Sequence, residues 1–169
     1  WEELEDGALV ASQPTGAPTW FPCNDRPDNR APMRLSVTTD AGYLAVPTGR
    51  PTGQTAAGGR VTVTAESSVP VATYLAALHV GRYARVELAG DDRVRVFTVP
   101  EMRGDAARAL VDVPRMLAVF EDAFGVYPQE DCALVVTPDV LEIPLEAQGM
   151  AVFGANHLGD CIHIRLCFI

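Results

Sequence analysis

Lysine is absent from this chain of 169 residues, so all 13 basic residues are arginine, against 22 acidic residues. The formal net charge of −9 gives a surface that repels the phosphates of nucleic acids and of anionic membranes. No apolar run approaches the ~20 residues that a membrane-spanning helix requires. We therefore expect no nucleic acid and no membrane among the partners of this protein.

Motifs of several enzyme classes are also missing. The sequence contains no G-x-S-x-G motif and no glycine-rich phosphate loop. Its three histidines leave little scope for a multi-histidine metal centre, and His79, in an apolar stretch, is predicted to be a core residue with satisfied hydrogen bonds. Zinc-type ligands do cluster near the end of the chain, but the gap between the second and third is too short for the usual structural sites. That cluster comprises His157, Cys161, His163 and Cys167, and we predict no metal site there.

Cysteine is scarce, with four residues at irregular spacing. Such spacing in a chain of this size does not indicate a disulfide framework. Cys23 and Cys132 are predicted to be buried free thiols, because unpaired cysteines commonly pack as small hydrophobic residues.

The first hundred residues alternate between apolar and polar side chains, which is typical of half-buried strands. The clearest runs lie at 33–37, 61–65 and 86–98, and the last of these predicts a hairpin around Gly90 and Asp91. Residues 74–80 fit a buried strand, although a short helix also fits. The Gly-, Thr- and Pro-rich residues 47–59 are predicted to be a loop. Short antiparallel strands at this spacing indicate a β-sandwich or a curved open sheet.

After Pro100 the apolar period lengthens and the acidic excess grows, with 11 acidic residues against four arginines in 101–169. Asp105 is predicted to cap a helix over 106–110, and Pro114 either kinks that helix or opens a second one. The second helix would present an apolar stripe and end at Gly125. Beyond it we predict a buried strand at 132–137, an acidic loop at 138–149 and another strand at 150–153. The stripe consists of Met116, Leu117, Phe120, Ala123 and Phe124.

Two segments carry candidate binding residues. Residues 13–25 contain Trp20 and Phe21 beside Pro22, and they form either a tight packed corner, with Asp25 accepting from the turn that follows, or a functional signature. Residues 142–149 contain two carboxylates between apolar runs. Their loop either binds an ammonium group, for which a carboxylate at a sheet edge is suited, or is an ordinary solvated acidic loop.

Four landmarks, in order, resemble the gluzincin zinc aminopeptidases, the alanyl aminopeptidase and leukotriene hydrolase group. They are Gln-Pro-Thr at 13–15 with Trp-Phe-Pro-Cys-Asn-Asp at 20–25, Pro-Val-Ala-Thr-Tyr-Leu at 70–75 with Val-Gly-Arg-Tyr at 80–83, Phe-Glu-Asp-Ala-Phe-Gly-Val-Tyr-Pro at 120–128, and Leu-Glu-Ala-Gln at 145–148. The last stretch stands where the family has its G-x-M-E-N exopeptidase loop. The resemblance covers nearly the whole chain.

The resemblance implies two substrate-binding residues. Gln13 stands at the family position that lines the first substrate pocket, and Glu146 at the position of the glutamate that binds the free amino terminus. A carboxylate beside an amide acceptor recognises an ammonium group and so counts residues from the end of a peptide. Departures from the motif are Ile143, Pro144 and Leu145 in place of Gly-x-Met and Ala147 in place of Asn.

The family's catalytic residues are missing from the sequence. Such enzymes hold zinc with H-E-x-x-H and a more distant glutamate, and the chain contains no such motif. We therefore expect zinc in the full-length parent enzyme, but no catalytic residue, no metal ligand and no cofactor in this stretch, which we expect to be an inactive fragment.

The fold class that the resemblance and the strand pattern imply is mainly β followed by α+β. We expect an antiparallel β-sandwich or saddle-like N-terminal domain over 1–99, and over 100–169 the truncated start of a thermolysin-like catalytic domain. The parent would hydrolyse the N-terminal residue from peptides with a free N-terminus, and without a visible signal peptide we expect it in the cytoplasm.

The alternative function is a non-enzymatic β-sandwich binding module with a helical extension, in which Gln13 and Glu146 are unrelated surface residues. The distance between these two residues discriminates the hypotheses, since a shared amine site requires them to be close.

Overall fold

Long strands form where apolar and polar residues alternate. The computed structural model describes residues 2–158, and in it β3 (Arg30–Asp40) pairs antiparallel with β6 (Arg60–Ala72) along nearly its whole length. Val37 lies opposite Val63 and Leu35 opposite Ala65, so the apolar residues of both strands share one face. The strands predicted at 33–37 and 61–65 are thus confirmed and are longer than the alternation indicated.

The loop predicted over residues 47–59 is wrong, because β5 (Arg50–Ala57) occupies most of it. This strand completes a three-stranded sheet in the order β3-β6-β5, with a turn at Gly58 and Gly59, whose φ angles are 58° and 75°. Every residue of β5 is exposed, so no apolar alternation marks it. Its stability comes from backbone pairing with β6, which the side-chain pattern does not reveal.

A second sheet packs on the first. Its antiparallel order is β1-β2-β7-β4, comprising β1 (Glu2–Leu4), β2 (Gly7–Val10), β7 (Leu78–Gly81) and β4 (Leu44–Pro47). Residues 74–80 combine the two alternatives left open by the sequence, since a 3₁₀ turn at Thr73–Leu75 precedes β7. Val10, Ala45, Val63 and Leu78 fill the interface between the two sheets, and the predicted β-sandwich is confirmed.

A third sheet is mixed, in the order β11-β12-β10-β9-β8. Its inner strands β12 (Met150–Gly154), β10 (Cys132–Thr137) and β9 (Val94–Thr98) are parallel, while the edge strands β11 (Leu145–Ala147) and β8 (Ala84–Val86) run antiparallel to their neighbours. The predicted hairpin of β8 and β9 and the predicted strands at 132–137 and 150–153 are confirmed.

Two helices connect β9 to β10, as a parallel crossover requires. They are α1 (Arg103–Leu110) and α2 (Val113–Phe124), and Pro114 lies in the first turn of α2, so it opens a second helix. Asp105 lies within the first turn of α1 and forms no cap hydrogen bond, so the predicted cap is wrong. In the predicted stripe, Leu117 is buried but Phe124 is 76% exposed. Within the described part of the chain, neither helix is long and apolar enough to cross a membrane.

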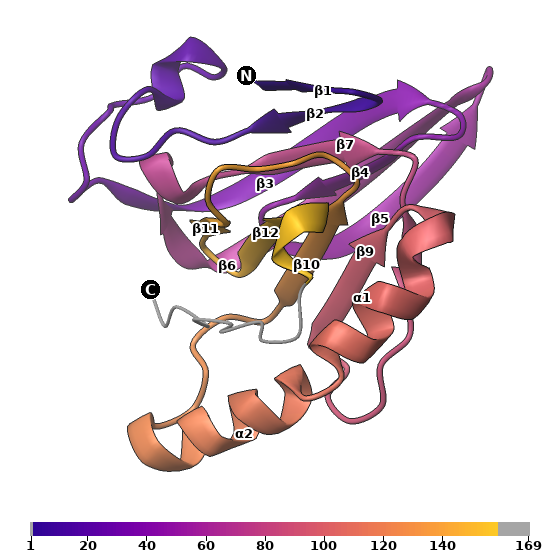
Figure 1. Ribbon diagram of the computed structural model, residues 1–169. Helices are drawn as coiled ribbons and strands as arrows, with labels where there is room; N and C mark the ends of the chain where they lie inside the picture. The colour runs from indigo at the N-terminus through magenta and orange to yellow at the C-terminus, as the bar shows by residue number, and fades with distance from the viewer. Residues whose placement is uncertain (1, 159–169) are drawn as a thin grey trace.

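Both faces of the mixed sheet are covered (Figure 1). Leu134 and Val136 of β10 pack with Leu110 and Leu117 of the helices, whereas Val135 packs with Leu9 and Val46 of the second sheet. Successive residues of a strand point to opposite faces, so the uninterrupted apolar run of β10 follows from burial on both sides.

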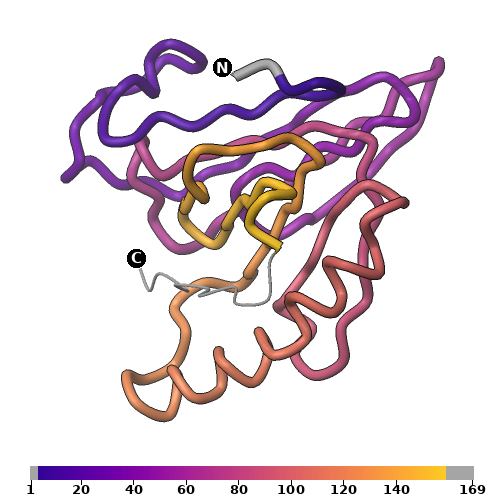
Figure 2. The backbone as a smooth tube through the Cα atoms, in the orientation of Figure 1, coloured from indigo at the N-terminus to yellow at the C-terminus, as the bar shows by residue number. Residues whose placement is uncertain are grey.

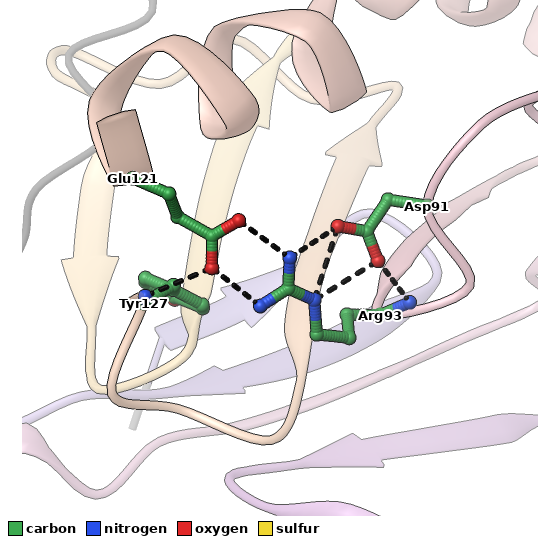
Figure 3. A network of polar contacts seen from close by, with 4 residues as sticks. All are labelled: Asp91, Arg93, Glu121 and Tyr127. Atoms are coloured by element: carbon green, nitrogen blue, oxygen red, sulfur yellow. Dashed lines mark hydrogen bonds and ion pairs between the residues drawn. The ribbon is translucent and has the colours of Figure 1, made fainter. Parts of the chain in front are cut away.

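An ion-pair network fastens α2 to the sheet (Figure 3). Arg93, just before β9, lies 2.6 Å from Asp91 and 2.7 Å from Glu121 of α2, and Glu121 also accepts the Tyr127 N–H at 2.9 Å. The Arg93 guanidinium lowers the pKa of both carboxyl groups. These contacts hold the end of α2 beside the loop that precedes β9.

The mixed sheet begins before the predicted domain division. Strands β8 and β9 precede residue 99, yet β9 pairs with β10, which follows it. Hydrogen bonding therefore crosses the division predicted between residues 1–99 and 100–169, and the division itself stays a prediction.

Candidate substrate-amine site

Gln13 lies at the start of a packed corner. Gln13 is exposed, and it follows β2 and precedes the 3₁₀ turn Ala17–Thr19. The Gly16 N–H donates to Asp25 Oδ2 at 2.9 Å, and the rings of Trp20 and Phe21 meet edge to face at 4.6 Å between centroids. The packed-corner interpretation therefore describes residues 16–25, although Asp25 accepts from a residue before it and not, as predicted, from the turn after it.

Glu146 lies at the centre of β11, the edge strand of the mixed sheet. The prediction of a loop through residue 149 is wrong here, because residues 145–147 pair antiparallel with β12 and Glu146 stands opposite Ala151. Three residues are too few for a periodic pattern to reveal a strand. The expectation of a carboxylate at a sheet edge is met, since Glu146 is half-buried on the outermost strand.

Gln148 fixes the turn between β11 and β12 to residues 70–75, a role that sequence reasoning missed. Its backbone N–H donates to the Leu75 carbonyl at 3.1 Å, and its buried side chain donates to the Pro70 carbonyl at 3.3 Å and to Gln129 Oε1 at 3.2 Å. The bonds to Leu75 and Pro70 set the position of β11 relative to the sandwich, and the bond to Gln129 ties the turn to the segment before β10. Nothing in the spacing of the sequence marked this glutamine.

The loop before β11 is also anchored. The Asn156 side chain accepts the Leu141 N–H at 3.1 Å and donates to the Leu141 carbonyl at 2.9 Å. The Asp139 carboxylate accepts the Glu5 N–H of the first hairpin at 2.8 Å. The solvated-loop interpretation suits Glu142, which is exposed, but residues 139–141 at the start of the loop are held by these bonds.

Gln13 and Glu146 are in contact. The Gln13 side-chain amide donates from Nε2 to the backbone carbonyl of Glu146, across 133 residues of sequence. Figure 2 shows the orange part of the chain that carries β11 returning beside the indigo strands near the N-terminus. A shared amine site requires Gln13 and Glu146 to be close, and the structure meets this requirement. The binding-module hypothesis does not require it.

The contact brings two acceptor groups, the Gln13 amide oxygen and the Glu146 carboxylate, to the same edge of the sheet. With the Gln13 NH₂ group directed at the Glu146 carbonyl, the amide oxygen of Gln13 remains as an acceptor beside the strand that carries the Glu146 carboxylate. An ammonium group has three donors and no acceptor, and hydrogen bonds to a carboxylate are the strong ones. The arrangement therefore suits a primary ammonium at the exposed edge of β11.

No group of three or more histidine, cysteine, aspartate or glutamate side chains suited to hold a metal is found within residues 2–158. Cys23 and Cys132 are free thiols, as predicted, but Cys23 is only half-buried. Burial raises the pKa of the Cys132 thiol to about 12, so it is not a nucleophile. Cys161, His163 and Cys167 lie outside the described residues.

His79 corrects one expectation. It is fully buried in β7, as predicted, but neither ring nitrogen has a hydrogen-bond partner among the described residues. Its ring meets that of Tyr83 edge to face at 5.1 Å between centroids. Burial lowers the pKa of His79 to about 4, which keeps the ring neutral near pH 7.

Comparison with known proteins finds similarity to one peptidase family. Residues 7–75 match the Peptidase M1 N-terminal domain. A zinc metallopeptidase of the same family from Deinococcus radiodurans, solved as a mutant bound to a Tyr-Ser-Ala substrate, superposes with a TM-score of 0.77 at 31% identity over 92% of this chain and 37% of that one. Residues 7–75 are thus identified as the N-terminal domain of an M1 peptidase.

The curated proteins to which this chain is similar are aminopeptidases. Aminopeptidase Q of Felis catus is 30% identical over 168 residues, covering 93% of this chain and 17% of the relative. Endoplasmic reticulum aminopeptidase 1 of Rattus norvegicus is 28% identical over 164 residues, covering 93% of this chain and 18% of the relative. The chain thus spans less than a fifth of the length of these relatives, and the predicted gluzincin resemblance is confirmed.

Proposed function

We propose that this chain is the substrate-amine-recognising part of a zinc aminopeptidase that hydrolyses the N-terminal residue from peptides. The observation that carries the proposal is the contact between Gln13 and Glu146 at an exposed sheet edge. The names of the relatives and the peptide bound to the Deinococcus radiodurans neighbour support it.

The two residues have distinct roles in this proposal. The Glu146 carboxylate neutralises the ammonium of the first substrate residue, and the Gln13 amide oxygen accepts a second of its N–H bonds. The bond from Gln13 to the Glu146 carbonyl holds the amide in one orientation, so that its oxygen faces the ligand. A peptide that lacks a free amine cannot donate charge-assisted hydrogen bonds to the Glu146 carboxylate, which gives exopeptidase selectivity.

Zinc, when bound in the complete enzyme, supplies a Lewis acid and lowers the pKa of its water so that hydroxide is available near neutral pH. Residues 2–158 contain no ligand set for it. The part of this chain in catalysis is therefore positional, because a fixed amine places the first peptide bond at a constant distance from the site of hydrolysis.

The departures from the family motif affect the contacts that this loop makes to the backbone of the substrate peptide. Pro144 immediately precedes the edge strand β11 and has no N–H to donate. Ala147 replaces an asparagine, which removes an amide side chain next to Glu146. We propose that the amine contact contributes a larger share of substrate affinity here than in relatives that keep the full motif.

The experiment that tests the proposal is steady-state kinetics of the complete enzyme with an aminoacyl chromogenic substrate. We expect Glu146→Gln to lower kcat/KM about 100-fold, the size of a lost charge-assisted hydrogen bond of ~3 kcal/mol. The matched control is Glu142→Gln, an exposed carboxylate on the preceding loop, which should leave kcat/KM unchanged. Equal effects of the two substitutions would contradict the proposal.

A further inference from the structure

A groove of about 390 Å³ lies between the ribbon of β5 and β6 and the mixed sheet. This volume is within the range of small-molecule sites, roughly 300–1,000 Å³. Its apolar lining includes Leu44, Val63 and Phe97, which come from three different strands. The groove does not include Gln13 or Glu146, so it is separate from the proposed amine site.

Three arginines converge on this groove from separate strands. They are Arg50 of β5, Arg85 of β8 and Arg95 of β9. Arg95 is already paired, because it forms a two-bond ion pair with Asp131 in which the side chains are only 12% and 7% exposed. Burial raises the pKa of Asp131, and the neighbouring arginines oppose that rise.

The other two arginines are less strongly paired with acidic residues. Arg50 forms no ion pair with any described residue, and its cross-strand neighbour Glu66 lies 3.4 Å from Arg34 instead. Arg85 lies 3.3 Å from Glu87, a pair in which the side chains are 47% and 79% exposed. Exposed pairs of this kind contribute little and exchange readily with other partners.

The groove is therefore positive within an acidic protein. Its lining holds the three arginines against two acids, Asp92 and Asp131, while the whole chain carries −9. Guanidinium groups bind carboxylates and phosphates through paired parallel hydrogen bonds. An apolar floor beside such groups favours an anion attached to an apolar body over a bare inorganic ion.

We propose that this groove binds a small organic anion, a carboxylate or phosphate ester, through Arg50 and Arg85, with its apolar part on Leu44 and Val63. Arg95 and Asp131, paired with each other, line the groove on the side of the mixed sheet. This site goes beyond the proposed function, because it shares no residue with the amine site and does not require peptidase activity.

The test is a titration of the 169-residue chain, followed by calorimetry or NMR. The probes are phenyl phosphate, benzoate, inorganic phosphate and, as a cationic control of the same shape, benzylamine. We expect phenyl phosphate or benzoate to bind at least about tenfold more tightly than inorganic phosphate, and benzylamine not to bind. Tighter binding of phenyl phosphate assigns the site to phosphate esters, and tighter binding of benzoate assigns it to carboxylates.

Substitutions of single arginines test where on the chain the probes bind. Arg50→Gln and Arg85→Gln should each weaken the favoured probe about tenfold, while Arg60→Gln, an exposed arginine at the far end of the ribbon paired with Asp40 at 3.7 Å, should not. Retention of binding in Arg50→Lys at an intermediate affinity would support paired guanidinium contacts. The proposal is overturned if neither organic anion binds, if benzylamine binds equally, or if Arg60→Gln weakens binding as much as Arg50→Gln.

Discussion

His79 occupies an inner strand of the second sheet with both ring nitrogens unpaired among the described residues. Asp139 is the acidic group that acts on it, and Tyr83 supplies a ring contact. The desolvation of the charged form outweighs the carboxylate and lowers the pKa to about 4. Burying a charged group without a partner costs free energy. Protonation of His79 at low pH therefore destabilises the sandwich.

We predict that stability falls below neutral pH because of His79. The folded pKa of about 4 lies below the ordinary histidine value of 6.5, so between these values the unfolded chain binds more protons and stability decreases as pH falls. From pH 7 to pH 5 the loss is about 2 kcal/mol. Urea unfolding of the native chain and of His79→Leu measures it, and a wild-type pH slope matching that of the variant would contradict the prediction.

Burial of His79 was predictable from its apolar neighbours, but the lack of partners was not. The hydrogen bonds of a core residue depend on what the facing strands present, here Leu9 and Val46 in register with His79. Both are apolar and offer no side-chain donor or acceptor. Local sequence carries no information on such cross-strand partners.

Strand β11 depends on one glycine. Gly149 has a φ of 68°, and a Cβ at this position would lie 2.9 Å from the Asp131 carbonyl oxygen. Both the left-handed backbone and the close approach exclude a side chain. The turn that carries Glu146 toward Gln13 therefore requires glycine at this position.

We predict that Gly149→Ala destabilises the chain by about 1–3 kcal/mol and disturbs the amine site. The control is Gly53→Ala in β5, where a Cβ would meet nothing within 4 Å. Thermal unfolding gives the stability of both variants, and NMR shifts of β11 report the site. Equal stability of the two alanine variants would show that the turn tolerates a side chain.

Elements with a long, regular side-chain period or a long apolar run were the predictable ones. The β3–β6 pair, the hairpin of β8 and β9 and the apolar strand β10 all followed from the pattern of their side chains. Five strands were missed: β5 is fully exposed, and β1, β2, β4 and β11 have only three or four residues. Backbone pairing with a neighbour creates such strands, and a neighbour is not visible in a local window.

At the scale of the whole molecule, segments from the two ends of the described chain meet. Residue spacing alone could not place Gln13 beside Glu146, since 133 residues separate them. The family resemblance predicted the pairing, and the contact agrees with it. Gln148, which fixes the relative position of the two parts through Pro70 and Leu75, had no counterpart in the sequence argument.

We predict that the 169-residue chain neither holds stoichiometric zinc nor cleaves aminoacyl chromogenic substrates. The physical reason is that residues 2–158 bring together no group of three potential metal ligands. Metal analysis after dialysis and a peptidase assay, with a characterised zinc aminopeptidase as positive control, measure both properties. One zinc per chain together with turnover would contradict the prediction.

Amine recognition by Gln13 and Glu146 is the central claim, and direct binding tests it most directly. We would titrate the chain with leucinamide and, separately, with N-acetyl-leucinamide, and follow the backbone amide shifts of β11 by NMR. We predict saturable shifts with the free amine, none with the acetylated compound, and their loss in Glu146→Gln but not in Glu142→Gln. Equal shifts with both compounds, or shifts that persist in Glu146→Gln, would contradict the account.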